Sequence, residues 1–335
     1  MAVSQEERSQ QVESPVRRRF ASFRAFFRFS FDDIFEASTT IFGALTILII
    51  AITLVFLVRG SVPVLQSFGT GFFTGTKWIA AAGIESYGVF PLVLGTLVTS
   101  AIAVVVGVPL SIGIAIFLAE MAPLSLRNAL SRVIELLAAV PSIVYGFWGL
   151  FVFRLWIRDY VETPLSNYVG SFPVFQGTPL GLDFLTAGLI LAIMIIPTVS
   201  SISKDVMTAV PSSQREAAYS IGATRWEVVR TGVLGYARSG IFGATILGLG
   251  RAVGETMAVT MIIGNIPALP TSFFQHGATM ASVIANEFSE AEPGSLHLSA
   301  LIGIGLTLFL FALVINVFAQ LMVWRVLKVR GGSVE

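Results

Sequence analysis

The chain has 335 residues, of which 55% are hydrophobic and only 12% are charged, a balance that excludes an ordinary soluble globular protein. Its 21 basic and 20 acidic residues leave a formal net charge of +1, so the overall charge does not favour nucleic acid as a partner. The absence of cysteine excludes a disulfide scaffold, a cysteine-based zinc site and a thiol nucleophile.

Six apolar segments follow one another along the chain. Five contain no charged residue, and one contains Arg251 and Glu255. The segments are residues 40–58, 86–119, 136–153, 184–203, 239–264 and 298–324. Each supplies the roughly 18 to 20 apolar residues that cross about 30 Å of hydrocarbon. Neither a soluble core nor a membrane β-barrel fits this periodicity. The sequence therefore predicts an all-α polytopic membrane protein with six transmembrane helices.

The basic residues predict the orientation in the membrane. Sixteen of the 21 Lys and Arg residues fall in the ends and loops on one side of these spans, and four fall on the other side. Because basic loops stay in the cytoplasm, both termini are predicted to be cytoplasmic in a multi-pass cell (inner) membrane protein. We expect a basic tail (1–39) without a secretory signal, a transmembrane domain (40–324) and a C-terminal tail (325–335). The Arg and Phe residues of 17–31 fit either a topology-setting tail or an arm in the headgroup layer.

A charged cytoplasmic loop, residues 204–238, is far longer than a helix hairpin requires. It contains two pairs with capping-box spacing, Ser213 with Glu216 and Thr224 with Glu227. Gly222, between the pairs, suits the left-handed conformation that ends a helix. The pattern predicts two short helices that project as a knob carrying four apolar residues, Tyr219, Ile221, Trp226 and Val229. From these residues alone, an amphipathic pair lying on the lipid surface fits as well.

The fifth apolar segment carries two charges. Arg251 and Glu255 are four residues apart, which predicts one helix face where their side chains meet. An unpaired arginine near the centre of a membrane helix costs about 2.5 to 3.5 kcal/mol, and such residues usually mark a transport path. A guanidinium fork matches a phosphate-like anion, whereas a structural ion pair is the alternative. Gly250 and Gly254, on the neighbouring face, permit close approach of another helix.

Other polar features carry weaker signals. Glu135 begins the predicted third span, where it fits either a helix cap or a gating residue, and Pro141 interrupts that span. The outer loop after the fifth span is acidic, with Glu287, Glu290 and Glu292, which favours docking of a soluble partner. No metal site, cofactor or catalytic residue is expected. The chain has no P-loop motif or hydrolase motif, so the energy for any transport must come from a partner subunit rather than from an enzyme activity of this chain.

The cytoplasmic loop resembles a known family motif. Glu216, Ala217 and Ala218, followed after three residues by Gly222, are similar to the EAA loop of ABC importer membrane subunits, which docks into a cleft of the ATPase. The resemblance implies that these four residues couple the chain to the ATPase. The family pattern continues with an aliphatic residue, a spacer, leucine and proline, whereas residues 232–235 read Gly-Val-Leu-Gly and keep only the leucine.

Three further stretches are similar to the PstC-type permeases of the phosphate-specific ABC importer. They are residues 249–260 (LGRAVGETMAVT, followed by Ile263-Gly264-Asn265), 135–146 and 281–299. The resemblance implies a MetI-like ABC importer permease fold that moves inorganic phosphate into the cytoplasm. It places Arg251 and Glu255 in the substrate pathway. From the residues themselves, and not from the resemblance, structural or gating roles are expected for Glu135, Pro141, Gly250 and Gly254.

The same resemblance implies a set of partners. They are a PstA-type permease in a heterodimer, a PstB-type ATPase dimer and a PstS-type periplasmic or lipid-anchored binding protein, all working at the lipid bilayer. Composition does not separate phosphate from sulfate or molybdate, so a permease for another oxyanion remains an alternative. A secondary anion carrier also remains open, although the halves of the chain show no internal repeat.

Overall fold

The computed structural model describes residues 15–81 and 83–328, and the side chains of residues 33–81 and 83–325. The chain divides into two compact units, Met1–Phe56 and Leu57–Glu335. Helix α1 (Pro15–Phe68) begins in the first unit and ends in the second. Within the two predicted tails, 1–39 and 325–335, residues 1–14 and 329–335 lie outside the described residues, as do the side chains of the Arg and Phe segment.

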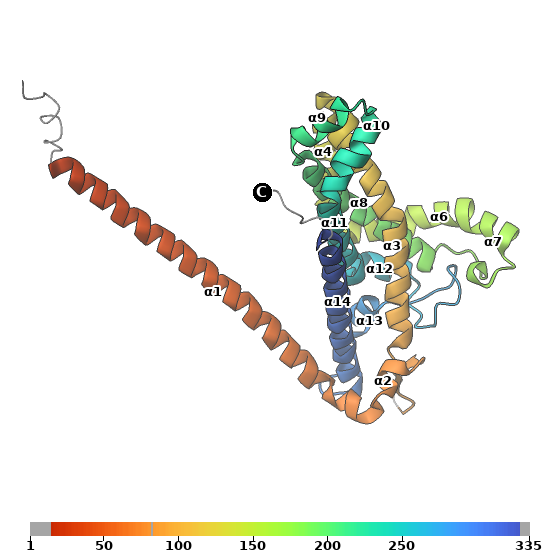
Figure 1. The fold of residues 1–335 in the computed structure, drawn as a ribbon. Helices are drawn as coiled ribbons and strands as arrows, with labels where there is room; N and C mark the ends of the chain where they lie inside the picture. Colours follow the sequence, from red (N-terminus) through yellow and green to blue (C-terminus); the bar gives the residue numbers. More distant parts are fainter. Residues whose placement is uncertain (1–14, 82, 329–335) are drawn as a thin grey trace, which may run out of the picture. The chain divides into compact units, whose positions relative to one another are not determined.

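The second unit is almost entirely helical (Figure 1). Its long helices are α3 (Phe90–Ile116), α8 (Phe184–Thr208), α11 (Leu234–Gly254) and α14 (Leu296–Lys328). Its short helices are α2 (Gly71–Thr74), α4 (Leu124–Ala138), α5 (Ser142–Trp148), α6 (Arg154–Ile157), α7 (Thr163–Val169), α9 (Ser212–Ser220), α10 (Arg225–Glu227), α12 (Met257–Ile262) and α13 (Met280–Glu287). Turns of π-helix are η2 (Phe117–Met121), η3 (Gly149–Phe153), η4 (Arg158–Glu162) and η6 (Val228–Val233), and η5 (Pro173–Phe175) is a 3₁₀ turn. Strands β1 (Trp78–Ile79) and β2 (Ser86–Tyr87) form an antiparallel hairpin in which Trp78 pairs with Tyr87.

Five helical segments among the described residues are long and apolar enough to cross a membrane, and the number is six if a bent pair counts as one span. Counted in that way, the structure has the six spans that were predicted. The third is not the straight helix expected over 136–153, because α4 and the helix that begins at Ser142 meet at 90°. Pro141 lies immediately before α5. Proline lacks the N–H that a continuous helix needs and disfavours helical geometry in the residue before it, so the chain turns here.

The fifth span also differs from the prediction. Helix α11 ends at Gly254, and Glu255 is extended, with φ −69° and ψ 130°. The backbone becomes helical again in α12, at Met257. The segment 239–264 is thus two helices with a break at Glu255 and Thr256.

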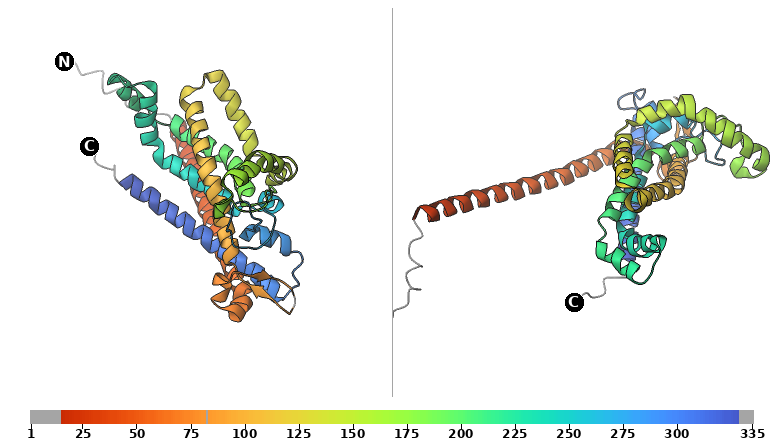
Figure 2. Two further views of the ribbon diagram at one scale, coloured as in Figure 1. Left: turned by 90° about the vertical axis from the view of Figure 1, so that its right-hand side faces the viewer. Right: turned by 90° about the horizontal axis from the view of Figure 1, so that it is seen from above.

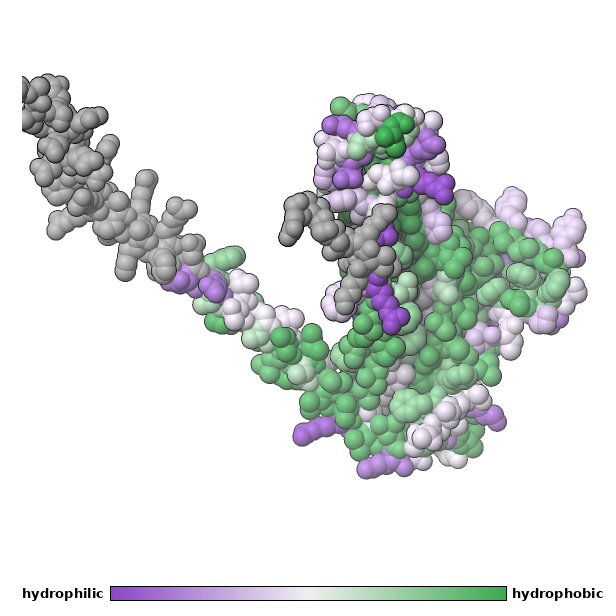
Figure 3. Space-filling model, viewed as in Figure 1, coloured by the Kyte–Doolittle hydropathy of each residue, from purple (hydrophilic) through white to green (hydrophobic). Residues whose placement is uncertain are grey.

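Helices α3 and α8 form the centre of the second unit and pack against each other more extensively than any other pair. Small residues allow this approach. A Cβ on Gly188 would lie 2.6 Å from the Cβ of Ile102, and one on Gly107 would lie 2.9 Å from the Cδ1 of Ile195. Buried side chains of α8, including Phe184, fill the core beside them. The visible flank of this bundle is broadly apolar in Figure 3, as expected for a surface that faces lipid.

The outer end of the unit is held by a polar contact. Trp78 Nε1 donates to both carboxylate oxygens of Glu287, at 3.1 and 3.0 Å, and His297 Nε2 lies 2.8 Å from Glu287 Oε2. The hairpin is thereby joined to α13 and α14. Glu287 thus has a structural contact within the chain, whereas Glu290 and Glu292 are exposed and remain available to a soluble partner.

The opposite end carries the cytoplasmic loop. Helices α9 and α10 project there, beside the start of α4 and the cytoplasmic ends of α3 and α8 (Figure 1). The left view of Figure 2 shows the C-terminal end of α14 directed towards this same end of the unit. This arrangement agrees with the predicted placement of the loop and the C-terminus on one side of the membrane.

Candidate functional site

The cytoplasmic knob consists of α9 and α10 joined through Gly222. Gly222 has φ +83°, and its N–H donates to Tyr219 O at 2.9 Å. An L-residue with a side chain rarely adopts this left-handed conformation, so glycine ends α9 as predicted. The knob is therefore two short helices at a fixed angle rather than one long helix.

The starts of the two helices differ. Thr224 Oγ1 accepts from Glu227 N at 3.4 Å, and Glu227 Oε2 accepts from Thr224 N at 2.8 Å, so the second predicted capping box is confirmed. The first, at Ser213 and Glu216, is wrong. Helix α9 begins at Ser212, directly after Pro211, and no side chain caps it. Pro211, with φ −56° and ψ 140°, takes the cap position, so the helix starts two residues earlier than a cap at Ser213 would place it.

The outer surface of the knob combines apolar and polar groups. Glu216 and Ala217 are exposed and Ala218 is half-buried. Three large apolar side chains are also exposed: Tyr219 by 51%, Ile221 by 85% and Trp226 by 53%. In Figure 3 an apolar patch lies among hydrophilic residues at this end of the molecule. Exposed aromatic and aliphatic side chains with a polar rim are typical of an interaction site.

The inner side of the knob corrects one expectation and explains another feature. Val229 is only 1% exposed, so it packs inside the loop instead of on its outer surface. Gly232 lies where η6 passes close to α9, and a Cβ there would be 3.2 Å from Gln214 O. The departure from the family pattern at Gly232 therefore accompanies close packing of the loop, whereas a Cβ on Gly235 would meet no atom within 4 Å.

The knob is attached to the membrane helices by residues that the motif search did not single out. Arg215 Nη2 of α9 lies 2.8 Å from Glu120 Oε1 at the end of α3, and Arg225 of α10 donates to the backbone carbonyl of Glu120. The signal in the sequence was an acidic residue directly after an uncharged span, with arginines in the following cytoplasmic loop. It is common in membrane proteins and gave no reason to pair these particular residues.

Arg251 lies in the last turn of α11, within the membrane-spanning region. Its Nη1 donates to Thr198 Oγ1 of α8 at 3.2 Å, and the side chain is half-buried. Across the described side chains, no carboxylate lies within ion-pair distance of this guanidinium. The two residues therefore do not share one helix face as expected, and the alternative of a structural ion pair between them is not found. Because the helix breaks after Gly254, the Glu255 carboxylate instead accepts from Ala258 N at 3.2 Å and caps the start of α12.

The predicted gating residues lie in two different places. Pro141 stands at the bend between α4 and α5, and α5 packs against α12, which follows the break beside Arg251. At Gly250 and Gly254 a Cβ would meet no atom within 4 Å, so both positions are open to a further helix. The bend in the third span and the open face of α11 thus belong to the region around Arg251.

Glu135 lies away from that region. It is near the end of α4, not at the start of a span, so it does not cap a helix N-terminus as predicted. The reason is that α4 begins eleven residues before Glu135, at Leu124, well before the apolar segment 136–153. Glu135 lines a polar cavity of about 530 Å³ between α4 and α8, together with Arg127, Asn128, Ser131, Arg132, Lys204, Asp205 and Thr208.

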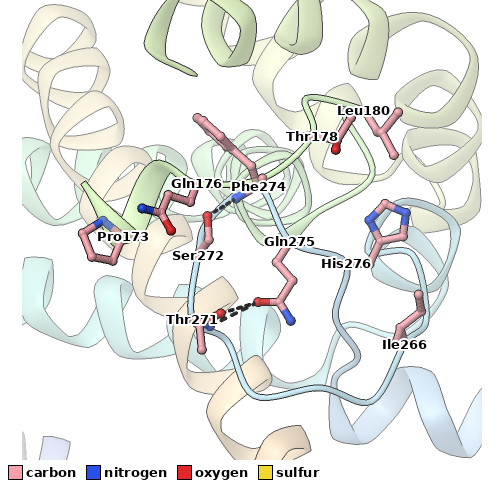
Figure 4. A pocket seen from close by; sticks show the side chains of 11 residues that line it. Pro173, Gln176, Thr178, Leu180, Ile266, Thr271, Ser272, Phe274, Gln275 and His276 are labelled. Atoms are coloured by element: carbon pink, nitrogen blue, oxygen red, sulfur yellow. Dashed lines mark hydrogen bonds between the residues drawn. The ribbon is translucent and has the colours of Figure 1, made fainter. Parts of the chain in front are cut away.

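The outer loops enclose a second cavity, of about 500 Å³ (Figure 4). Its lining contains no Asp, Glu, Lys or Arg; it consists of apolar, amide and hydroxyl side chains and the imidazole of His276, from residues 173–180 and 266–276. Thr271 Oγ1 and Gln275 Oε1 are 2.7 Å apart, and Ser272 Oγ accepts from Phe274 N at 3.2 Å. Within the described residues no group of three or more His, Asp or Glu side chains could hold a metal ion.

The spans and the projecting knob define a class of protein. Residues 111–328 match the family model described as binding-protein-dependent transport system inner membrane component. A chain in the crystal structure of a bacterial ABC transporter involved in the import of the acidic polysaccharide alginate has the same fold, with a TM-score of 0.53 and 18% identity over 84% of this chain and 94% of that chain. This protein is a multi-pass inner membrane subunit of an ABC importer rather than an enzyme, and such a subunit works with ATPase, permease and binding-protein partners.

Closer relatives define the family. The chain is 44% identical to the phosphate transport system permease protein PstC of Haemophilus influenzae, over 90% of this chain and 95% of the relative. It is 43% identical to PstC of Mesorhizobium japonicum (88% and 90% covered) and 38% identical to PstC 2 of Mycobacterium tuberculosis (90% and 92% covered). The chain belongs to the PstC family of phosphate transport system permease proteins, and the predicted family and permease fold are confirmed.

Proposed function

We propose that this chain is a permease subunit through which an ABC importer moves inorganic phosphate into the cytoplasm, using ATP hydrolysed in a separate subunit. The observation that carries the proposal is the 44% identity over 90% of the chain to a phosphate transport permease. The proposed partners are a PstA-type permease, a PstB-type ATPase dimer and a PstS-type phosphate-binding protein. The open positions at Gly250 and Gly254 support the approach of a second permease helix.

Arg251 is the residue proposed to meet the anion. A guanidinium has five N–H donors, and one hydrogen bond to Thr198 occupies only one of them. Phosphate oxygens accept the remaining donors in a fork geometry that a lysine ammonium does not offer. Because Arg251 has no carboxylate partner in the described part of the chain, an arriving anion does not have to displace one. Glu255 contributes by holding the start of α12, beside the break at which the pathway is proposed to open.

The proposed mechanism is alternating access. Binding of ATP closes the ATPase pair, and the knob, with Glu216, Ala217, Ala218 and Gly222, follows that movement. The membrane helices then reorient around Arg251, so that phosphate delivered on the outer side is released on the cytoplasmic side. The exposed apolar side chains of the knob supply the docking surface that this mechanism requires.

The direct test is uptake of labelled phosphate into proteoliposomes that contain this chain and its partners, with and without ATP on the ATPase side. We expect uptake that requires ATP and that unlabelled phosphate suppresses, whereas sulfate and molybdate do not. Suppression by sulfate or molybdate would instead identify a permease for another oxyanion. Uptake that is independent of ATP would identify a secondary carrier and would contradict the proposed role of the knob.

A further inference from the structure

The cytoplasmic end of α3 is held by arginines from three separate elements. It finishes in the π-helical turn η2, which contains Glu120. Arg215 of α9 donates to the Glu120 carboxylate through Nη2 at 2.8 Å and through Nε at 3.3 and 3.4 Å. Arg225 of α10 donates to the Glu120 backbone carbonyl, and Arg127 Nη2 of α4 donates to Ala119 O at 2.8 Å. Both helices of the knob therefore bind the same residue of α3.

Arg215 also reaches the end of α8. Its Nη1 donates to Val210 O at 2.6 Å and its Nη2 donates to Met207 O at 2.9 Å. The last carbonyls of a helix have no partner inside the helix, and a cation there is favoured by the helix dipole. One guanidinium thus joins α9 to the ends of both α3 and α8, the two helices that form the centre of the unit.

The contact is shielded from solvent and specific in geometry. The Glu120 side chain is 12% exposed and the Arg215 side chain 23% exposed. A charged pair with this burial and with a two-point fork is stronger than a typical surface ion pair. In addition, π-helical turns interrupt regular helix geometry and occur frequently at functional sites. Movement of α9 therefore acts on η2 through a short, directional contact.

We propose that Glu120 and Arg215 are positioning residues that transmit movement of the knob to α3 and α8. This rests on the proposed function, because it assumes that the knob follows an ATPase. The contact continues into the membrane along α8, whose Thr198 is hydrogen-bonded to Arg251. The contiguous route thus runs from α9 through Arg215 to α8 and from there to the proposed anion site. A purely structural anchor would instead hold the loop in place without affecting how much phosphate each ATP moves.

The test measures phosphate uptake and ATP hydrolysis together in proteoliposomes that contain the complete complex. The variants are Glu120→Gln, which removes the charge, and Arg215→Lys, which keeps the charge and removes the fork. Arg230→Gln is the matched control, because Arg230 is exposed in the same loop. We expect the phosphate moved per ATP to fall about tenfold in Glu120→Gln and in Arg215→Lys, with ATP hydrolysis within about twofold of wild type. The control Arg230→Gln should keep the wild-type value of phosphate moved per ATP. The double variant is expected to be no worse than Arg215→Lys alone, because that change already breaks the fork to Glu120 together with the bonds to Val210 and Met207.

The outcomes separate this proposal from the proposed function. A wild-type complex without ATP-driven phosphate uptake would overturn the proposed function itself. If the wild type transports phosphate and both variants keep its phosphate per ATP, the transmission proposal is wrong. Equal losses of ATP hydrolysis and uptake, or loss of assembly in both conservative variants, would assign a structural role and would also overturn it.

A second measurement uses the absence of cysteine in the chain. Spin labels on Ser213→Cys in α9 and Leu110→Cys in α3 report the distance between these helices in the assembled complex, at rest and after trapping with ATP and vanadate. If the knob and α3 move together, the distribution of the distance between the two labels has the same width at rest and after trapping when Glu120 is present. In the Glu120→Gln background the distribution should broaden. An equally narrow distribution in Glu120→Gln would contradict transmission through this residue.

Discussion

A buried pair of carboxyl groups predicts how the stability of the outer end depends on pH. Glu162 is 0% exposed and Asp183 is 1% exposed. Glu162 accepts from Gly181 N at 2.9 Å and from Thr186 Oγ1 at 3.0 Å, whereas Asp183 Oδ1 accepts from Thr186 N at 2.8 Å and caps α8. Burial, followed by the hydrogen bond and negative charge of Glu162, raises the pKa of Asp183 from 3.8 to about 8. Burial therefore favours the protonated form of Asp183 in the folded protein at neutral pH.

The sign of the effect follows from proton binding. Between pH 4 and pH 8 the folded state binds the Asp183 proton and the unfolded state does not, so the free energy of unfolding falls as pH rises. The slope approaches about 1.4 kcal/mol per pH unit, which gives a loss of about 3 to 4 kcal/mol from pH 5 to pH 8. For a chain of this size the melting temperature should fall by roughly 5 °C.

The assay is thermal unfolding of the purified protein in detergent across this pH range. Asp183→Asn is the informative variant, because asparagine caps a helix as well as aspartate and its neutral amide carries N–H donors but does not titrate. We expect this variant to lose most of the pH dependence while keeping the stability that the wild type has at pH 5. Asp205→Asn is the control, because the Asp205 side chain is 68% exposed. The same slope in wild type and Asp183→Asn would refute the reasoning.

Three further predictions follow from the other contacts. Arg251→Ala should lower the initial rate of phosphate uptake at least about tenfold without preventing assembly, and Arg251→Lys should restore only part of that rate. A normal uptake rate in the alanine variant would remove Arg251 from the pathway. Gly222→Pro should uncouple ATP hydrolysis from uptake, because proline fixes φ near −65° where Gly222 has +83°. The control Gly235→Ala in the same loop should behave as wild type, and coupled uptake in the proline variant would contradict the role of the knob. Glu287→Gln should lower the free energy of unfolding, measured by thermal denaturation, by about 1 to 2 kcal/mol, because it weakens the contact with Trp78 and His297. Glu290→Gln, at an exposed position, is the control, and equal stabilities of the two variants would show that this contact is not stabilising.

Hydropathy predicted the spans because each segment had to cover the hydrocarbon by itself, a requirement that is local in sequence. The left-handed turn at Gly222 and the capping box at Thr224 were predictable for the same reason, since both depend on neighbouring residues. The break after Gly254 was not predicted, because the helical spacing of Arg251 and Glu255 was taken as a contact. The contact between Arg215 and Glu120 joins residues 95 positions apart, and no local pattern contains that information.

The two broken helices and the arginine between them have one physical explanation. Irregular backbone at membrane depth leaves N–H and C=O groups without helix partners, and it persists only where protein covers it or where it lines an aqueous cavity. One break, at Pro141, leads into α5, and the other, at Glu255, leads into α12. These two short helices pack closely, since a Cβ on Gly146 would lie 2.7 Å from Met261 Sδ. Arg251 lies immediately before the second break, half-buried and without a carboxylate partner among the described residues. Such a charge is expensive in hydrocarbon, so its position beside interrupted helices favours a polar path there over a simple kink in a lipid-facing span.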